Sequence, residues 1–185
     1  MRKQGKIDLA IEKYRTAYNI AKNRSNFTIM GDCMINLSNL YKATGKYDKS
    51  LELLHSSAGF FPEDNHRYRG MIDLNIGNIQ DLQNRVEKAI ESYSSALTHF
   101  KALPDIYSVS KCYVNLGNQF LKVRNLENAI AHYRKAESIA KEQNFTGILI
   151  STYNNYGEYY RLLKDYDSSY YFYRESLQLQ ESSGI

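Results

Sequence analysis

The sequence predicts an all-α protein built from stacked pairs of helices, about nine helices in all. An asparagine-containing block recurs at steps of 39, 40 and 40 residues, starting at Asn36, Asn75, Asn115 and Asn155. A second block, with small, large and small residues at helical spacing, follows each of these blocks. A fixed period in this range is typical of stacked-repeat architectures. Such proteins work through an extended binding surface, so we expect an interaction protein without a catalytic pocket.

The first helix of each unit carries a bulky residue, a small residue and an aromatic residue on one face. This pattern reads Leu37/Ser38/Tyr41, Leu116/Gly117/Phe120 and Tyr156/Gly157/Tyr160, whereas the second unit has Gln80 at the aromatic position. Residues four apart share a helix face, and a small residue lets a neighbouring helix approach. A glycine inside a helix costs about 1 kcal/mol relative to alanine. Its recurrence at one position therefore predicts close packing there.

The second helix of each unit carries a small, a large and another small residue on one face. The five copies are Ala10/Tyr14/Ala17, Ser50/Leu54/Ser57, Ala89/Tyr93/Ala96, Ala129/Tyr133/Ala136 and Ser169/Tyr173/Ser176. An acidic residue is expected in the first turn of each, where it suits the helix dipole: Asp8, Asp48, Glu87, Glu127 and Asp167. Gly45 and Asn84 are expected to adopt the left-handed conformation that ends the preceding helix.

These residues resemble the tetratricopeptide repeat family, whose pattern is bulky residue, glycine and tyrosine on helix A, then alanine, aromatic and alanine on helix B. The period near 40 is similar to that of kinesin light chains and bacterial peptide-sensing regulators. The family's tryptophan is absent, and its proline after helix B is in register only at Pro62. The resemblance implies a right-handed superhelical solenoid of antiparallel helix pairs, with a concave groove lined by the A helices.

The repeats divide the chain into half a repeat and four full ones. The expected bounds are 1–25 for the half repeat, then 26–65, 66–104, 105–144 and 145–185. The final B helix has an apolar load on more than one face, including Tyr170 and Tyr171, which lie outside the repeat pattern. Tyrosines at repeat positions are expected in the core: Tyr41, Tyr47, Tyr93, Tyr133, Tyr160, Tyr166 and Tyr173. We expect a segment of a longer protein, whose last helix meets a second copy or a neighbouring domain.

Composition and motifs argue against several other functions. No apolar run approaches the roughly 20 residues of a membrane helix. The net charge of +4 is spread along the chain, which does not favour nucleic-acid binding. The four histidines lack metal-ligand spacing, and no phosphate loop or nucleophile arrangement is present, so we expect no enzyme activity, metal or cofactor. Cys33 and Cys112, at equivalent repeat positions, are interpreted as buried thiols.

The recurring asparagines are the candidate binding site. Asn36, Asn75, Asn115 and Asn155 share one A-helix position, and three residues later stand Asn39, Asn78, Asn118 and Glu158. By resemblance, both positions face the groove, where an amide side chain offers a donor and an acceptor to a peptide backbone. Lys122 and Arg161 complete the predicted peptide site. The alternative is that these asparagines bond neighbouring helices or face water.

Neighbouring groove positions carry Asp32, Lys42 and Lys111. Together with the asparagines they match only part of the clamp that some family members use to bind a terminal carboxylate. The leading hypothesis is a non-catalytic module that binds an extended peptide or protein segment. The alternative is a sensory or regulatory segment of a larger bacterial signalling or transcription-regulating protein. A structural assembly role, in which the end helices oligomerise, is a third interpretation.

Overall fold

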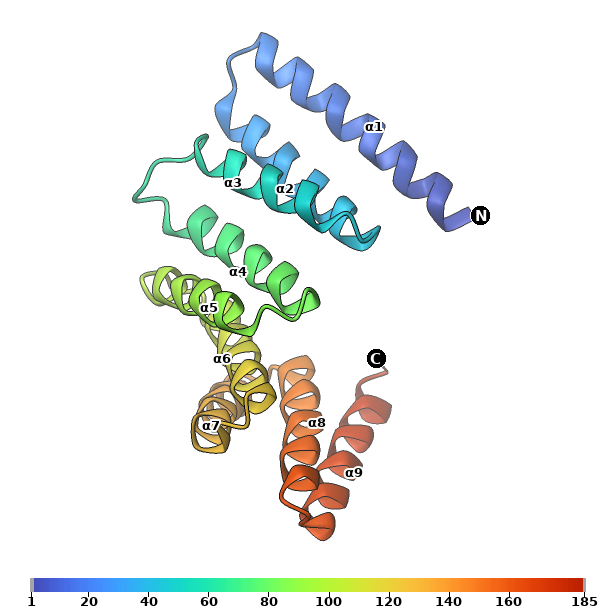
Figure 1. Cartoon of the computed structure of the whole chain (residues 1–185), viewed down its shortest axis with the longest axis vertical. Coiled ribbons are helices and arrows are strands. Elements are labelled where there is room, and N and C mark those ends of the chain that lie inside the picture. Colours follow the sequence, from blue (N-terminus) through green and yellow to red (C-terminus); the bar gives the residue numbers. More distant parts are fainter. Residues whose placement is uncertain (1, 185) are drawn as a thin grey trace. The chain divides into compact units, whose positions relative to one another are not determined.

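The computed structural model describes residues 2–184, and this stretch forms nine helices and no strands (Figure 1). The chain separates into two compact units, one up to His99 and the other from Phe100 onward. The helices are α1 Arg2–Asn23, α2 Phe27–Ala43, α3 Tyr47–Ala58, α4 His66–Leu82, α5 Val86–Lys101, α6 Ile106–Lys122, α7 Leu126–Glu142, α8 Thr146–Leu162 and α9 Tyr166–Ser183. The even-numbered helices correspond to the A helices of the repeat pattern and the odd-numbered helices to the B helices.

Left-handed residues make the short turns between A and B helices. Gly45 and Asn84 have φ values of 73° and 56°, which confirms their predicted role. Arg124 and Lys164 do the same in the two later turns, with φ values of 59° and 62°. In each turn the next amide donates to a carbonyl five residues back, as Asn125 does to Phe120 at 2.9 Å. This bond satisfies one of the unpaired carbonyls at the helix end and reverses the chain.

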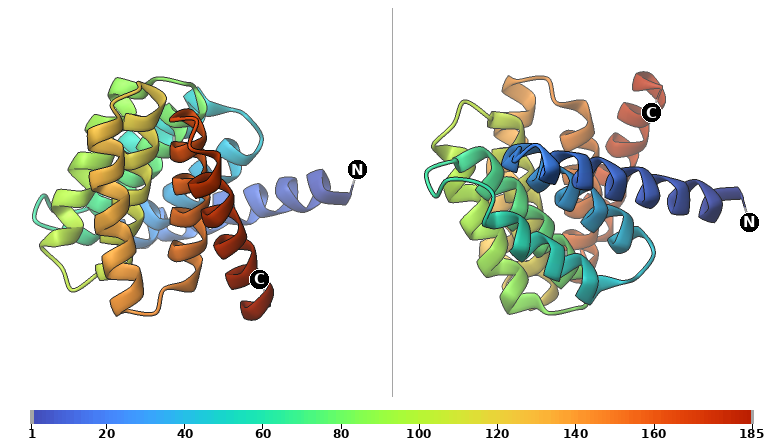
Figure 2. Two further views of the ribbon diagram at one scale, coloured as in Figure 1. Left: turned by 90° about the horizontal axis from the view of Figure 1, so that it is seen from below. Right: turned by 90° about the horizontal axis from the view of Figure 1, so that it is seen from above.

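Short polar side chains begin most of the helices. The side chains of Asn26, Asn65 and Asp105 accept hydrogen bonds from amides in the first turns of α2, α4 and α6. Phe145 precedes α8 and cannot do this. The predicted first-turn acids lie in the first turns of α3, α5, α7 and α9, but not in α1. That helix runs through Gly5 without a turn, and its N-terminal half extends past α2 (Figure 2), so Asp8 lies within the helix.

Glycines in the A helices pack directly against tyrosine rings of the B helices. A Cβ atom added to Gly77 would lie 2.7 Å from Tyr93, and one added to Gly117 would lie 2.4 Å from Tyr133. Gly157 faces Tyr173 in the same way, at 2.6 Å. Distances this short leave no room for a methyl group. They confirm the predicted close packing, because only a residue without a side chain lets the tyrosine ring approach the A helix this closely.

Burial of the repeat tyrosines differs along the chain. Tyr41, Tyr93 and Tyr133 are buried, whereas the side chains of Tyr166 and Tyr173 are 66% and 38% exposed. The expectation of a core position was therefore wrong for Tyr166 and Tyr173, because α9 packs on α8 and, among the described residues of its unit, no helix covers its other face. Tyr170 and Tyr171 of α9 are also exposed.

Candidate functional site on the A helices

Neighbouring A helices contact each other within each unit. α2 touches α4 in the first unit, and α6 touches α8 in the second. The candidate asparagines stand on these helices, and each of their side chains is half-buried. We call Asn36, Asn75, Asn115 and Asn155 the first series, and Asn39, Asn78, Asn118 and Glu158 the second series. The structure gives the two series different surroundings.

Two asparagines of the first series are held by their own helix. The Nδ2 group of Asn36 donates to the carbonyl of Asp32 at 2.9 Å, and that of Asn75 donates to the carbonyl of Met71 at 3.0 Å. The amide oxygen therefore points away from the helix backbone. Lys42 Nζ donates to the Oδ1 atom of Asn75 at 3.4 Å, which joins α2 to α4 across the A-helix face.

Three members of the second series contact tyrosines of the B helices, whereas Leu54 stands at the equivalent position for Asn39. The hydroxyl group of Tyr93 donates to Asn78 Oδ1 at 3.0 Å, and that of Tyr133 donates to Asn118 Oδ1 at 2.8 Å. Tyr173 OH lies 3.5 Å from a carboxylate oxygen of Glu158. These bonds support the alternative that part of the asparagine pattern is structural. Sequence reasoning missed them, although a constant spacing of fifteen residues links each pair.

The two predicted cations of the site lie in different settings. Lys122 is exposed in the last turn of α6. Arg161 donates through two nitrogens to both carboxylate oxygens of Glu158, at 2.7 and 2.6 Å. These hydrogen bonds hold the pKa of Glu158 below its ordinary value. Arg161 is thus paired along its own helix, which reduces its availability to a partner.

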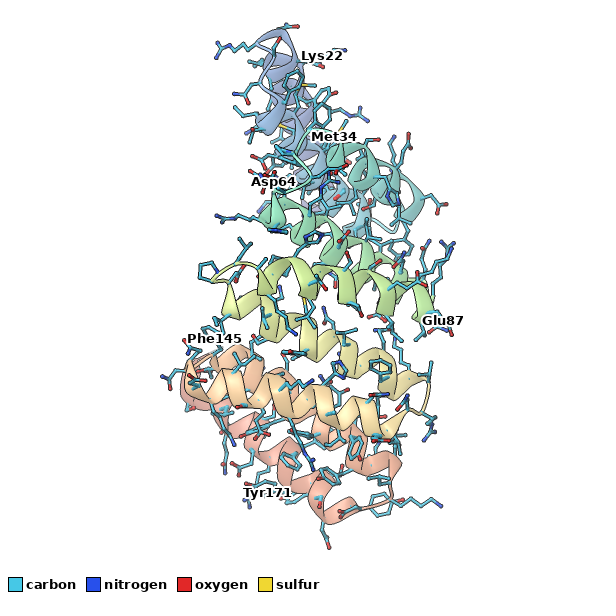
Figure 3. The ribbon with its side chains drawn as sticks, turned by 90° about the vertical axis from the view of Figure 1, so that its left-hand side faces the viewer. Lys22, Met34, Asp64, Glu87, Phe145 and Tyr171 are labelled. Carbon is cyan, nitrogen blue, oxygen red and sulfur yellow. The ribbon has the colours of Figure 1, made fainter. Side chains whose placement is uncertain are left out.

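Asn115 lines a pocket of about 210 Å³ between α6 and α8. Tyr107, Lys111, Val114, Gly147, Ile148 and Ser151 complete its wall, and we call it the Asn115 pocket. Phe145, labelled in Figure 3, lies at the start of α8, and its ring meets the ring of Tyr107 edge-on with centroids 5.1 Å apart. The pocket brings a first-series asparagine together with a lysine that sequence reasoning placed only near the groove.

Two cysteines and two histidines lie outside the candidate site. Cys33 and Cys112 are buried free thiols, as predicted, and burial raises the pKa of Cys112 to about 12. His66 and His99, far apart in sequence, bring their Nδ1 atoms within 3.0 Å. Within residues 2–184, no group of three metal-ligating side chains could hold a metal ion. No helix in that range is long and apolar enough to cross a membrane.

Solved structures with the same fold include several helical-repeat proteins. BtubC (BKLC) from P. vanneervenii has a TM-score of 0.84 at 21% identity, over 99% of this chain and 76% of that one. MamA has a TM-score of 0.68 at 20% identity, over 99% and 94%. A Rap protein complexed with Competence and Sporulation Factor has a TM-score of 0.80 at 19% identity, over 97% of this chain and 50% of that one. These likenesses establish an all-α helical repeat solenoid.

At the level of sequence, none of the curated proteins matches the chain. Two family models described as tetratricopeptide repeat match residues 31–58 and 108–182. These stretches contain the glycine–tyrosine contacts of Gly117 and Gly157 and the recurring asparagines of α2, α6 and α8. The repeat pattern, the helix pairs and the two matches together show that the chain belongs to the tetratricopeptide repeat family.

Proposed function

We propose that this chain is a non-catalytic protein-interaction module that binds an extended peptide or protein segment on its A-helix face. The first series of asparagines carries the proposal. An extended peptide exposes backbone N–H and C=O groups at regular intervals, and an asparagine amide offers both an acceptor and a donor to them. Repeated amides on successive A helices therefore fit a partner whose own backbone repeats.

The hydrogen bonds of the first series support this assignment. Asn36 and Asn75 use Nδ2 on their own helix. Oδ1 is then the group that Asn36 presents to a partner, whereas Oδ1 of Asn75 also accepts a long hydrogen bond, 3.4 Å, from Lys42 and keeps one lone pair for a partner. Among the described residues of the second unit, no side-chain hydrogen bond fixes Asn115 or Asn155. Half-buried amides without a fixed partner are suited to binding, because they lose little on exchanging water for a peptide group.

The second series serves a different purpose in this proposal. Asn78 and Asn118 accept hydrogen bonds from buried tyrosines, so their oxygens are occupied within the repeat. Each Nδ2 group is left to face the partner as a donor. The second series thus adds donors to the face, while the first series adds acceptors. Lys122 extends the face by a positive charge, as the sequence predicted.

Solved structures with this fold include proteins that hold peptides. One is a Rap conjugation gene regulator of the plasmid pLS20 in complex with the Phr* peptide, with a TM-score of 0.73 at 13% identity. The match covers 85% of this chain and 44% of that regulator. The shared fold makes a peptide-binding role on the A helices compatible with this architecture. The support from individual residues of this chain comes from the first series of asparagines.

The test compares asparagines that differ only in the helix face they occupy. The double variant Asn115→Ala/Asn155→Ala and the matched control Asn154→Ala are used as bait in a lysate of the source organism. Asn154 is exposed and lies one residue from Asn155, about 100° around the helix. We expect partners retained by the control and lost by the double variant, with equal helicity for both. Equal retention by all baits would contradict the proposal.

A second candidate, a regulatory segment of a larger bacterial signalling protein, is favoured by the likeness to the Rap conjugation gene regulator in complex with the Phr* peptide. A regulator must change its structure when the peptide binds, whereas a simple holding module need not. Amide hydrogen exchange with and without a bound peptide separates them. Protection confined to the even-numbered helices indicates a holding module. Protection that extends to α3 and α7 indicates regulation.

A further inference from the structure

The Asn115 pocket has a single charged residue in its wall. Lys111 is exposed on α6, and its Nζ atom lies 5.9 Å from the centre of the Tyr107 ring. The Tyr107 ring in turn makes an edge-to-face contact with the ring of Phe145. A lysine over an aromatic face is attracted by the ring, which favours an ammonium group at the rim. Lys111 is thus the one ionised side chain among the described residues that line the pocket.

The rest of the wall combines apolar and polar surface in similar amounts. Val114 and Ile148 are buried and offer aliphatic surface. Ser151 Oγ donates its hydrogen to the carbonyl of Gly147 at 2.9 Å, which leaves the hydroxyl oxygen as an acceptor. The Asn115 amide supplies the remaining donor. The wall therefore offers both apolar contact and hydrogen-bonding groups to a side chain of a partner.

Gly147 keeps the α8 side of the pocket open. A Cβ atom added to this glycine would meet no heavy atom within 4 Å. This differs from Gly117 and Gly157, where an added Cβ would strike a tyrosine ring. Because Gly147 lines the pocket, a larger residue at position 147 would extend into the open space there without disturbing the packing of α8. The position offers a way to fill the pocket and leave its charge unchanged.

We propose that the Asn115 pocket receives a glutamate side chain of the bound peptide, with the neighbouring peptide backbone on Asn115. The inference rests on the proposed peptide-binding function and names one feature of the partner. A glutamate has two methylene groups to cover the apolar wall and a carboxylate to reach Lys111. Charge-assisted hydrogen bonds to lysine are stronger than neutral ones. A terminal carboxylate lacks this aliphatic stem, and a phosphate group would favour an arginine fork.

The experiment selects random peptides, displayed on phage, for binding to the full chain. We expect the selected peptides to align on one position rich in glutamate. Synthetic versions of the strongest peptide are then measured with that glutamate replaced by glutamine, and separately with an amidated C-terminus. The glutamine version should bind about tenfold more weakly, a factor that corresponds to about 1.4 kcal/mol. The amidated version should bind as the parent does.

Three variants of the chain locate the effect. Lys111→Glu should lose about tenfold in affinity for the parent peptide and less for the glutamine version. Gly147→Leu should weaken both, because it fills the pocket. Lys88→Glu, an exposed lysine on the B helix α5, is the charge-matched control and should leave both affinities unchanged.

The outcomes separate the inference from the function on which it rests. The inference alone is overturned in two cases, in both of which peptide binding depends on Asn115 and Asn155. In the first, the selected peptides have no preferred glutamate. In the second, Lys111→Glu leaves their affinity unchanged. Loss of binding on amidation assigns the contact to a terminal carboxylate and also overturns it. If no peptide binds, or if the asparagine variants have no effect, the proposed function fails and the inference fails with it.

Discussion

The repeats α6–α7 and α8–α9 carry the same packing motif in different surroundings. In both, an A-helix glycine faces a B-helix tyrosine, as Gly117 faces Tyr133 and Gly157 faces Tyr173. Tyr133 is completely buried, whereas Tyr173 is 38% exposed. The reason is that α7 is packed between α6 and α8, while α9 is packed on one side, against α8. The burial of a side chain at a given repeat position therefore depends on which helices cover it.

The same contrast affects the polar part of the motif. Tyr133 OH donates to Asn118 at 2.8 Å, but Tyr173 OH lies 3.5 Å from Glu158, which is also bonded to Arg161. A buried hydrogen bond is expensive to lose, since the remaining partner is left without water. An exposed one is replaced by water at little cost. Substitutions at equivalent positions of the two repeats should therefore have unequal effects.

The largest difference is expected for alanine at the packing glycines. In Gly117→Ala the new methyl group strikes the ring of Tyr133, which is enclosed and has nowhere to move. Overpacking of this kind costs about 1–3 kcal/mol, partly offset by about 1 kcal/mol of improved helix propensity. In Gly157→Ala the exposed Tyr173 can rotate away, so the two terms should nearly cancel. Urea unfolding of both variants measures the difference, and equal destabilisation would show that α9 is as confined as α7.

A smaller effect is expected on removal of the tyrosine hydroxyl groups. Tyr133→Phe leaves the Asn118 oxygen without its donor and should lower the free energy of unfolding by about 1 kcal/mol. Tyr173→Phe should change it by a few tenths at most, because that contact is long and exposed. Thermal unfolding followed by circular dichroism compares the two variants. A larger loss of stability for Tyr173→Phe than for Tyr133→Phe would contradict the expectation that the buried hydrogen bond contributes more than the exposed one.

The smallest effect is a pH dependence confined to α8–α9. Its hydrogen bonds with Arg161 lower the pKa of Glu158, so the folded state favours the carboxylate. This contribution is complete above the ordinary pKa of glutamate and is lost as the pH falls through the lowered value. Glu158→Gln should therefore be slightly less stable than the parent at neutral pH, and the difference should disappear once the pH is below the lowered pKa of Glu158. A difference in Tm that persists in acid would exclude this pair as its cause.

Much of the fold follows from the period and from a few residue types. The recurring glycine predicted close packing, and Gly45 and Asn84 predicted left-handed turns, because both depend on local backbone chemistry. Arg124 and Lys164 adopt the same conformation without any preference for it. There the five-residue-back hydrogen bond and the packing of the helix pair outweigh the strain of a side chain at positive φ, which is of order 1 kcal/mol.

The candidate site was predicted less completely. The sequence placed the asparagines on one face, but it treated the two series as equivalent. The tyrosine hydroxyl groups that occupy Asn78 and Asn118 come from another helix, and only the packed pair brings them within reach. The Asn115 pocket likewise combines residues of α6 and α8 that are separated by a whole helix pair.

By itself the sequence determined the all-α repeat architecture, the helix pairs and the small positions at which neighbouring helices pack closely. These features follow from helical periodicity and from residue size, which act over short distances along the chain. Only the tertiary structure decided which asparagines are occupied, which tyrosines are covered and where a pocket opens. Those properties depend on which neighbouring helix packs against each surface. Identical local motifs therefore acquire different burial, hydrogen bonds and stability.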